Sequence, residues 1–202
     1  MNYPNSIKNL IECYKKLPGV GEKTAERLAL ATLKLSDDTI DLFSKSIRDC
    51  KIKTKKCEIC NSFSENDICD ICQDETRDSK ILCVLEEPKN VYLFEKIGTY
   101  NGKYYVLDGL ISPLDGIGPE DVGIYKLIEL IKKESINEVI LALKPSLEGE
   151  TTSLYISKSL EKNDVLVSRI AQGIPMYTDI DYIDTMTLEK ALNDRKKISG
   201  NN

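Results

Sequence analysis

Four of the seven cysteines are arranged in a pattern that binds metal ions. The pattern has two C-x2-C pairs separated by eight residues, and its members are Cys57, Cys60, Cys69 and Cys72. Four thiolates at this spacing can converge on one tetrahedral ion, and Zn²⁺ prefers such a set. Because four sulfur ligands leave no open position, we expect one structural zinc ion per chain. Two local disulfides, or iron in the same site, are the alternatives, and a reducing compartment disfavours the disulfides.

A second motif joins two expected helices through a glycine turn. It reads Leu-Pro-Gly-Val-Gly-Glu-Lys over residues 17–23 and is followed by Arg27. Gly19 and Gly21 permit a tight turn with exposed backbone amides, and amides at a helix start bind phosphate. Lys23 and Arg27 lie four residues apart, so both point from the same face of the helix. The motif predicts a grip on a phosphate backbone without base readout, and a helical hairpin with solvated charges is the alternative.

Charge is distributed unevenly along the chain. The net charge of −5, from 28 basic and 33 acidic residues, taken alone argues against nucleic-acid binding. Residues 1–56, however, hold 12 basic against 7 acidic residues, and the remaining 146 hold 16 against 26. Such asymmetry points to a local polyanion site, and chance with solvated helix faces is the alternative. Further DNA contacts are predicted at Lys51, Lys53, Lys55 and Lys56.

Two absences limit the chemistry that the chain can perform. It contains no histidine, which excludes catalysis and metal binding by that side chain. No apolar run approaches the roughly 18 residues that a membrane span needs, so no membrane association is expected.

The elements that must position these motifs follow from apolar periodicity. Three amphipathic helices are expected within residues 1–52, and the polar segment 51–78 needs its metal in place of an apolar core. Short apolar runs alternate with helical patterns from residue 80 onward, which favours a parallel α/β sheet. The expected strands are 81–85, 104–107, 139–143 and 165–167. The expected helices are 91–97, 122–133 and 151–162, and an extended tail to Ile183 precedes a helix from Thr187 to about Lys197.

Taken together, the motifs resemble the RecR family of bacterial recombination mediators. The glycine turn followed by the four cysteines resembles that family's helix–hairpin–helix and zinc modules. Residues 84–91 resemble the first strand and loop of a Toprim domain, and residues 107–121 and 144–152 are close to family signatures. Residues 169–195 resemble its Walker B-like C-terminal segment.

The resemblance implies a mixed α/β chain of four parts. These are a helix–hairpin–helix module (1–53), a four-cysteine zinc motif (54–78), a Toprim-like domain with a parallel-rich sheet (79–172) and a C-terminal oligomerisation segment (173–202). The C-terminal segment has no P-loop partner, so ATP hydrolysis is not expected, and its aspartates are interpreted as structural or interface residues: Asp179, Asp181 and Asp184.

The resemblance also implies a function in DNA repair. Members bind single- and double-stranded DNA without sequence preference, and they act with RecO, and in some species RecF, to load RecA. They form dimers that pair into a ring-like tetramer. Lys23 and Arg27 match the family's DNA-contacting positions, and the four cysteines match its zinc ligands. A cytoplasmic, nucleoid-associated, non-enzymatic protein is therefore expected.

The chain lacks some of the acidic residues that an active Toprim site uses to bind metal. Such a site holds Mg²⁺ with a Glu after its first strand and an Asp-x-Asp after its third. Glu86 stands at the first place, but residues 144–146 are Lys, Pro and Ser. With Glu148 and Glu150, Glu86 is predicted to form an acidic docking site for a basic partner such as RecO. The rival interpretations are a Mg²⁺-dependent Toprim nuclease or topoisomerase, and a scaffold that binds only proteins.

Overall fold

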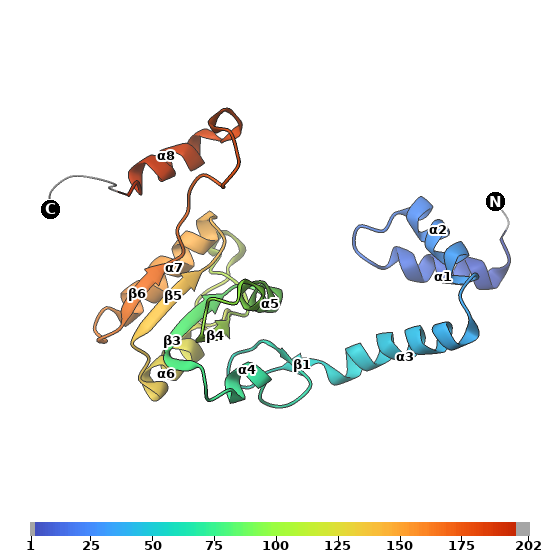
Figure 1. Cartoon of the computed structure of the whole chain (residues 1–202), viewed down its shortest axis with the longest axis horizontal. Helices are drawn as coiled ribbons and strands as arrows, with labels where there is room; N and C mark the ends of the chain where they lie inside the picture. Colours follow the sequence, from blue (N-terminus) through green and yellow to red (C-terminus); the bar gives the residue numbers. More distant parts are fainter. Residues whose placement is uncertain (1–2, 197–202) are drawn as a thin grey trace. The chain divides into compact units, whose positions relative to one another are not determined.

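The computed structural model describes residues 3–196. It divides into two units, the hairpin unit (Met1–Thr54) and the sheet unit (Lys55–Asn202) (Figure 1). Each unit is described separately below. None of the helices between residues 3 and 196 combines the length and apolar composition that crossing a lipid bilayer requires.

The first unit contains three helices, α1 (Asn5–Lys15), α2 (Glu22–Thr32) and α3 (Asp37–Lys53). All three were expected from the apolar spacing. Helices α1 and α2 pack against each other around Ile11, Ala25 and Ala29. The two alanines are fully buried, and their small side chains let the helices approach closely.

Helix α3 has well-matched ends but no buried residue along its 17 residues. The Ser36 hydroxyl accepts a hydrogen bond from the amide of Thr39, which caps the start. Two aspartates lie in the first turn and two lysines in the last, so both ends complement the helix dipole.

The second unit begins with the cysteine-bearing segment. Two short antiparallel strands, β1 (Lys55–Lys56) and β2 (Phe63–Ser64), precede the one-turn helix α4 (Asp70–Gln73). This segment buries little apolar surface besides its cysteines and the isoleucines packed on them.

A four-stranded, all-parallel sheet forms the centre of the second unit. Its strand order is β4-β3-β5-β6, and the strands are β3 (Asp78–Leu85), β4 (Gly102–Val106), β5 (Glu138–Ala142) and β6 (Leu166–Arg169). In register, Leu85 pairs with Ala142, so the carboxyl ends of the two central strands are level. The expected parallel sheet is confirmed, with strand bounds that differ by a few residues.

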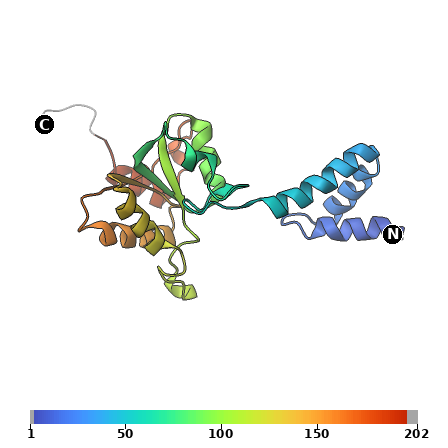
Figure 2. The same ribbon diagram turned by 90° about the horizontal axis from the view of Figure 1, so that it is seen from below.

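Helices cover both faces of the sheet (Figure 2). One face packs on α6 (Ile124–Glu134) and α7 (Leu147–Leu160) through a large apolar cluster that includes Leu82, Leu127 and Ile156. The other face packs on α5 (Pro88–Ile97) through Val91 and Leu85. Successive strand residues point to opposite faces, so uniformly apolar strands serve both layers.

The C-terminal segment follows β6. It is irregular to Asp184 apart from a short 3₁₀ turn at Ile180–Tyr182, and helix α8 then spans Thr185–Asn193. The Asp184 carboxylate accepts a hydrogen bond from the Thr187 amide, 2.9 Å away, and so caps α8. The expected helix thus starts two residues earlier and ends sooner; Lys197, its expected end, lies outside the described residues.

Candidate functional site

The four cysteines converge as a metal site requires. Their sulfur atoms all lie within 4.8 Å of one another. The Sγ–Sγ distances are 3.9 Å for Cys57–Cys72 and 3.6 Å for Cys60–Cys69. Four sulfurs at ~2.3 Å from a tetrahedral zinc ion would be ~3.8 Å apart. The cluster is therefore close to the size that a zinc ion requires, and all four ligand positions are sulfur.

Backbone geometry positions the two cysteine pairs. In the first pair, Asn61 has a left-handed conformation with φ of 59°, and its amide donates to the Cys57 carbonyl. In the second pair, Cys69 is the N-cap of α4, and its amide donates to the Cys57 sulfur at 3.3 Å. An amide that points at a sulfur stabilises the thiolate form.

The sulfur atoms are too close to ionise independently. Hydrogen bonding between Cys60 and Cys69 raises the pKa of the Cys60 thiol and lowers the pKa of Cys69. A divalent cation at the centre removes this conflict, because it favours the thiolate form of all four residues.

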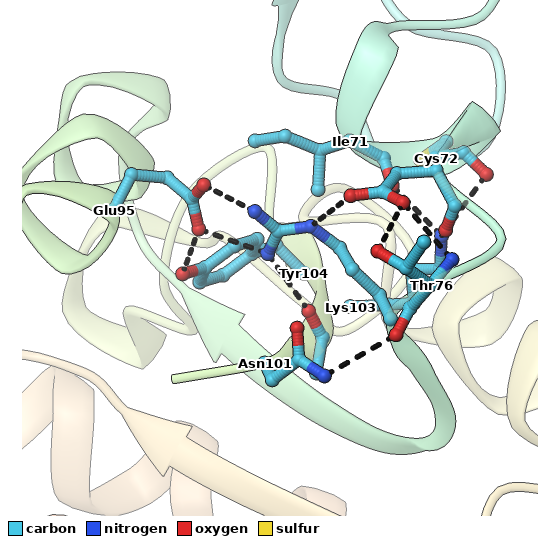
Figure 3. Close-up of polar contacts among 10 residues, drawn as sticks. Ile71, Cys72, Thr76, Glu95, Asn101, Lys103 and Tyr104 are labelled. Carbon is cyan, nitrogen blue, oxygen red and sulfur yellow. Dashed lines mark hydrogen bonds and ion pairs between the residues drawn. The ribbon is translucent and has the colours of Figure 1, made fainter. Parts of the chain in front are cut away.

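The cysteine-bearing segment of residues 55–77, called the zinc module below, is hydrogen-bonded to strand β4 at both cysteine pairs. Next to the first pair, the Val106 amide donates to the Cys60 carbonyl and the Asn61 side chain donates to the Val106 carbonyl. At the second pair, the Lys103 ammonium donates to three carbonyls at 2.6–3.2 Å (Figure 3): those of Ile71, Cys72 and Asp74. One cation thus satisfies carbonyl groups at the C-terminal end of α4.

A second cation links the same module to α5. The Arg77 guanidinium forms an ion pair with Glu95, which also accepts a hydrogen bond from the Tyr104 hydroxyl at 2.7 Å (Figure 3). Burial disfavours a charged Glu95, but Arg77 and Tyr104 outweigh it, so that the pKa of this carboxyl is lowered. The zinc module is therefore part of the sheet unit.

Lys23 and Arg27 lie together on the exposed surface of α2. Both border a shallow depression of about 360 Å³, whose other residues are Glu26, Leu30, Ala31 and Lys34. Among residues 3–196, neither cation has an ion-pair partner. This side of α2 is therefore available to an external anion.

The glycine turn before α2 leaves the amides at the start of the helix without a side-chain cap. Gly19 has φ of 78°, a conformation that favours glycine, and Gly21 precedes the first helical residue. No side chain caps the start of α2, and a Cβ at either glycine would have no neighbour within 4 Å. Uncapped amides beside open space suit an incoming phosphate.

The structure does not bring all predicted DNA contacts together. Lys51 and Lys53 lie on α3, whereas Lys55 and Lys56 form β1 in the other unit. Three of these four lysines pair with carboxylates: Lys53 with Asp49, Lys55 with Asp67 and Lys56 with Asp108. They are less available to an external anion than the two cations of α2.

At the carboxyl ends of strands β3 and β5, a lysine side chain neutralises the glutamate that was predicted to bind a metal ion or a partner. Glu86 follows β3, and Lys144 follows β5 with its Nζ 3.0 Å from the Glu86 carboxylate. This ion pair raises the pKa of Lys144, so the ammonium stays charged. A carboxylate neutralised by an ammonium group in this way is a poor ligand for a divalent cation.

The other two predicted acidic residues have different surroundings. Glu148 accepts a hydrogen bond from Ser146, which lowers the pKa of Glu148. Glu150 forms ion pairs with Lys190 of α8 and with Arg169 of β6, both at 2.8 Å. Glu148 is half-buried and forms no ion pair within residues 3–196, whereas Glu150 ties the C-terminal helix to the sheet unit.

Sequence reasoning missed three cations that the structure makes prominent, Lys34, Arg77 and Lys103. The helical spacing from Lys23 and Arg27 to Lys34 was visible in the sequence. The partners of Lys103 lie about thirty residues away in the chain, so no local pattern indicated its role.

Comparisons with known proteins match the whole described architecture in order. Family matches cover the RecR helix-hairpin-helix at residues 7–51 and the RecR zinc finger domain with four cysteines at 54–74. They continue with the Toprim domain at 80–171 and the RecR C-terminal region at 173–196. Proteins named Recombination protein RecR from Staphylococcus aureus strains Mu3, Mu50 and JH9 are each 45% identical over 198 residues, which covers 98% of this chain and 100% of each relative.

Proposed function

The chain belongs to the RecR family of recombination proteins, and on that premise we propose that it is a non-enzymatic DNA-binding clamp that helps load a recombinase during DNA repair. Lys23 and Arg27 hold DNA phosphates, and the amides next to Gly19 and Gly21 assist them. The observation that carries the proposal is the basic side of α2, which has no ion-pair partner among residues 3–196 and lies beside an uncapped helix start. Contacts of this kind neutralise phosphates and read no bases.

The ion pair between Glu86 and Lys144 supports a non-enzymatic Toprim domain. A metal-dependent nuclease needs two or three converging carboxylates to hold Mg²⁺. Here an ammonium group neutralises the first carboxylate internally, and Ser146 bonds to Glu148. Glu86 favours the rival Mg²⁺-dependent enzyme. Cleavage of a DNA duplex that depends on Mg²⁺ and is lost in Glu86→Gln would establish that rival.

We propose that the chain acts with RecO, and in some species RecF, to bring RecA to single-stranded DNA in the cytoplasm, near the nucleoid. Glu86, Glu148 and Glu150 are the proposed acidic docking residues. Of these, only Glu148 forms no ion pair within residues 3–196, so its charge is the one left for a partner. Glu148→Lys is expected to weaken RecO binding and to leave DNA binding unchanged; unaltered RecO affinity would refute this role.

We propose that the chain forms homodimers that assemble into a ring-like tetramer. Helix α3 supports self-association, because Phe43 and Ile47 are 46% and 58% exposed on its apolar stripe. Its first half carries three aspartates, and its second half is mainly basic. Two antiparallel copies of α3 would place opposite charges together. Since α3 has no buried residue, Ile47→Asp should preserve the fold and lower the mass measured by light scattering.

The central test is the double variant Lys23→Ala/Arg27→Ala. Losing two phosphate contacts should weaken binding to every DNA sequence and reduce the slope of log K against log salt by about 2. Fluorescence anisotropy over a salt series, with a duplex and with a single strand, measures both quantities. Equal affinity and slope for variant and wild type would refute phosphate binding at α2.

A further inference from the structure

Helix α2 carries acidic residues immediately before its two DNA-binding cations. Glu22 precedes Lys23, and Glu26 precedes Arg27. Residues four apart share a helix face, so the two carboxylates form one stripe beside the stripe of the two cations. A carboxylate free to turn toward Lys23 or Arg27 would compete with a phosphate for the same cation.

Both carboxylates are bonded to groups of α1 or of the residues just before it. Glu26 also borders the basic depression, but its carboxylate is bonded to Tyr3. The Tyr3 hydroxyl donates a hydrogen bond to Glu26, and this bond raises the pKa of Tyr3, so the phenol keeps its proton. Lys15 of α1 forms ion pairs with Glu22 and with Glu12, each at 2.8 Å. The depression on the α1 side is lined mainly by acidic and apolar residues: Tyr3, Lys8, Ile11, Glu12, Glu22 and Glu26.

The other side of α2 continues beyond Arg27 to a third cation. Lys34 borders the same depression as Lys23 and Arg27, with Leu30 and Ala31 between. Leu33 keeps a helical conformation, and the Lys34 amide donates to the Ala31 carbonyl, so Lys34 continues the helical path. Within residues 3–196, Lys34 has no ion-pair partner.

The spacing of the three cations suits a phosphate backbone. At ~1.5 Å per residue, Lys23 and Arg27 are ~6 Å apart along the helix, and Lys34 lies ~10 Å further. The full stripe of ~16 Å corresponds to about five nucleotide steps of one strand in duplex DNA. Lys34 would therefore meet a different phosphate from those held by Lys23 and Arg27.

We propose that Lys34 is a third phosphate contact in a basic groove along α2, and that Tyr3 and Lys15 are positioning residues that keep the carboxylates of Glu26 and Glu22 from pairing with Lys23 and Arg27. This inference rests on the proposed DNA-binding function of α2. The ligand is the sugar-phosphate backbone of DNA.

The first experiment compares Lys34→Ala with Lys8→Ala in the full-length protein. Lys8 is a matched control, because it is also a lysine of the first unit but borders the depression on the α1 side. Lys34→Ala should reduce the salt slope by about 0.9 for a duplex and weaken binding roughly tenfold at about 50 mM salt. Lys8→Ala should change neither quantity.

The outcomes separate this inference from the function on which it rests. If Lys34→Ala behaves as Lys8→Ala does while Lys23→Ala/Arg27→Ala weakens binding, the groove ends at Arg27 and Lys34 has no role. If Lys23→Ala/Arg27→Ala also leaves binding unchanged, the proposed function itself fails.

A second experiment tests the positioning role with a variant that alters no charge. Tyr3→Phe removes one hydroxyl and keeps the ring that packs against the α1–α2 core. With Glu26 released, DNA affinity should fall about twofold, the size of a side-chain pair on a helix surface. In a Glu26→Gln background, Tyr3→Phe should have no effect. Equal losses in both backgrounds would show that Tyr3 acts through packing and would overturn its positioning role.

Discussion

The hairpin unit and the sheet unit treat their charged residues in opposite ways. In the sheet unit, Glu86, Glu95 and Glu150 each have a cationic partner within the unit. In the hairpin unit, the two carboxylates of α2 are bonded to Tyr3 and Lys15. Lys23 and Arg27 of the same helix have no ion-pair partner within residues 3–196. The comparison shows that a binding surface is distinguished by charged side chains that lack a partner within the protein. The number of charged side chains does not distinguish it.

The two units also differ in how they obtain stability. The hairpin unit relies on a small core around Ile11, Ala25 and Ala29 and on a glycine turn with a positive φ. The sheet unit has a large apolar core and adds a metal site that is hydrogen-bonded to β4. Changes to the metal site should therefore affect only the sheet unit.

The largest expected effect comes from loss of zinc. Cys69→Ser removes a ligand, and structural zinc contributes about 10 kcal/mol to the folding of small zinc-binding peptides. We expect loss of bound zinc and a much lower melting temperature for the sheet unit, with the helices of the hairpin unit retained. Metal analysis and calorimetry measure these changes. Cys13→Ser, at an exposed cysteine of α1, is the control and should alter neither.

A smaller effect is expected from Lys103→Met. The substitution keeps the length of the side chain and leaves three carbonyls without their shared donor, at a cost of about 2–3 kcal/mol. Thermal melting and the rate of zinc release to a chromogenic chelator should both report the loss. Lys126→Met, on the exposed side of α6, should change neither; equal effects of the two variants would contradict the role of Lys103.

The glycine turn allows a matched comparison inside the hairpin unit. Alanine at position 19 must adopt a positive φ, so Gly19→Ala should cost about 1 kcal/mol. Gly21→Ala meets no neighbour and keeps an ordinary φ of −82°, so only the weaker preference for alanine at an N-cap opposes it, at a cost of about 0.5 kcal/mol. Chemical denaturation followed by circular dichroism distinguishes the two. Equal costs would mean that the turn conformation contributes nothing.

The smallest effect concerns the partners of Glu150. Its ion pairs are partly exposed, so Glu150→Gln should lower stability by at most about 1 kcal/mol. Lys190 holds the pKa of Glu150 below its ordinary value of 4.5, so this contribution is present at neutral pH and is lost as the carboxylate is protonated. The stability difference between variant and wild type should vanish as the pH falls below 4.5. Glu189→Gln, on the same helix, should show no such difference at any pH.

Local patterns made the zinc ligands and the sheet strands predictable from the sequence. The spacing of Cys57 and Cys60 reflects a single backbone turn, and each apolar strand occupies one short run of residues. Two-residue strands such as β1 and β2 are too short to leave a pattern. Partners far apart in the chain were equally invisible: Lys56 binds Asp108, which is 52 residues away.

The predicted DNA contacts are not equivalent, because folding pairs some of them and not others. Lys55 and Lys56 contribute to a run of positive charge in the sequence, yet folding supplies each with a carboxylate. The sequence around Lys23 and Arg27 is no richer in basic residues than the run that contains Lys55 and Lys56. Folding nevertheless leaves Lys23 and Arg27 without an ion-pair partner among residues 3–196. The composition of residues 1–56 showed that this region is basic. The fold is needed to show which of its basic side chains lack an ion-pair partner.

The position of β4 at the margin of the sheet has a consequence for protein quality control. An outer strand offers unpaired amides and carbonyls to other chains, which is a common route to aggregation. Here the zinc module binds the Val106 amide and carbonyl through Cys60 and Asn61. In a cell that lacks zinc, the outer strand β4 would therefore have unpaired backbone groups at Val106. Such chains should aggregate and precipitate before their helices unfold.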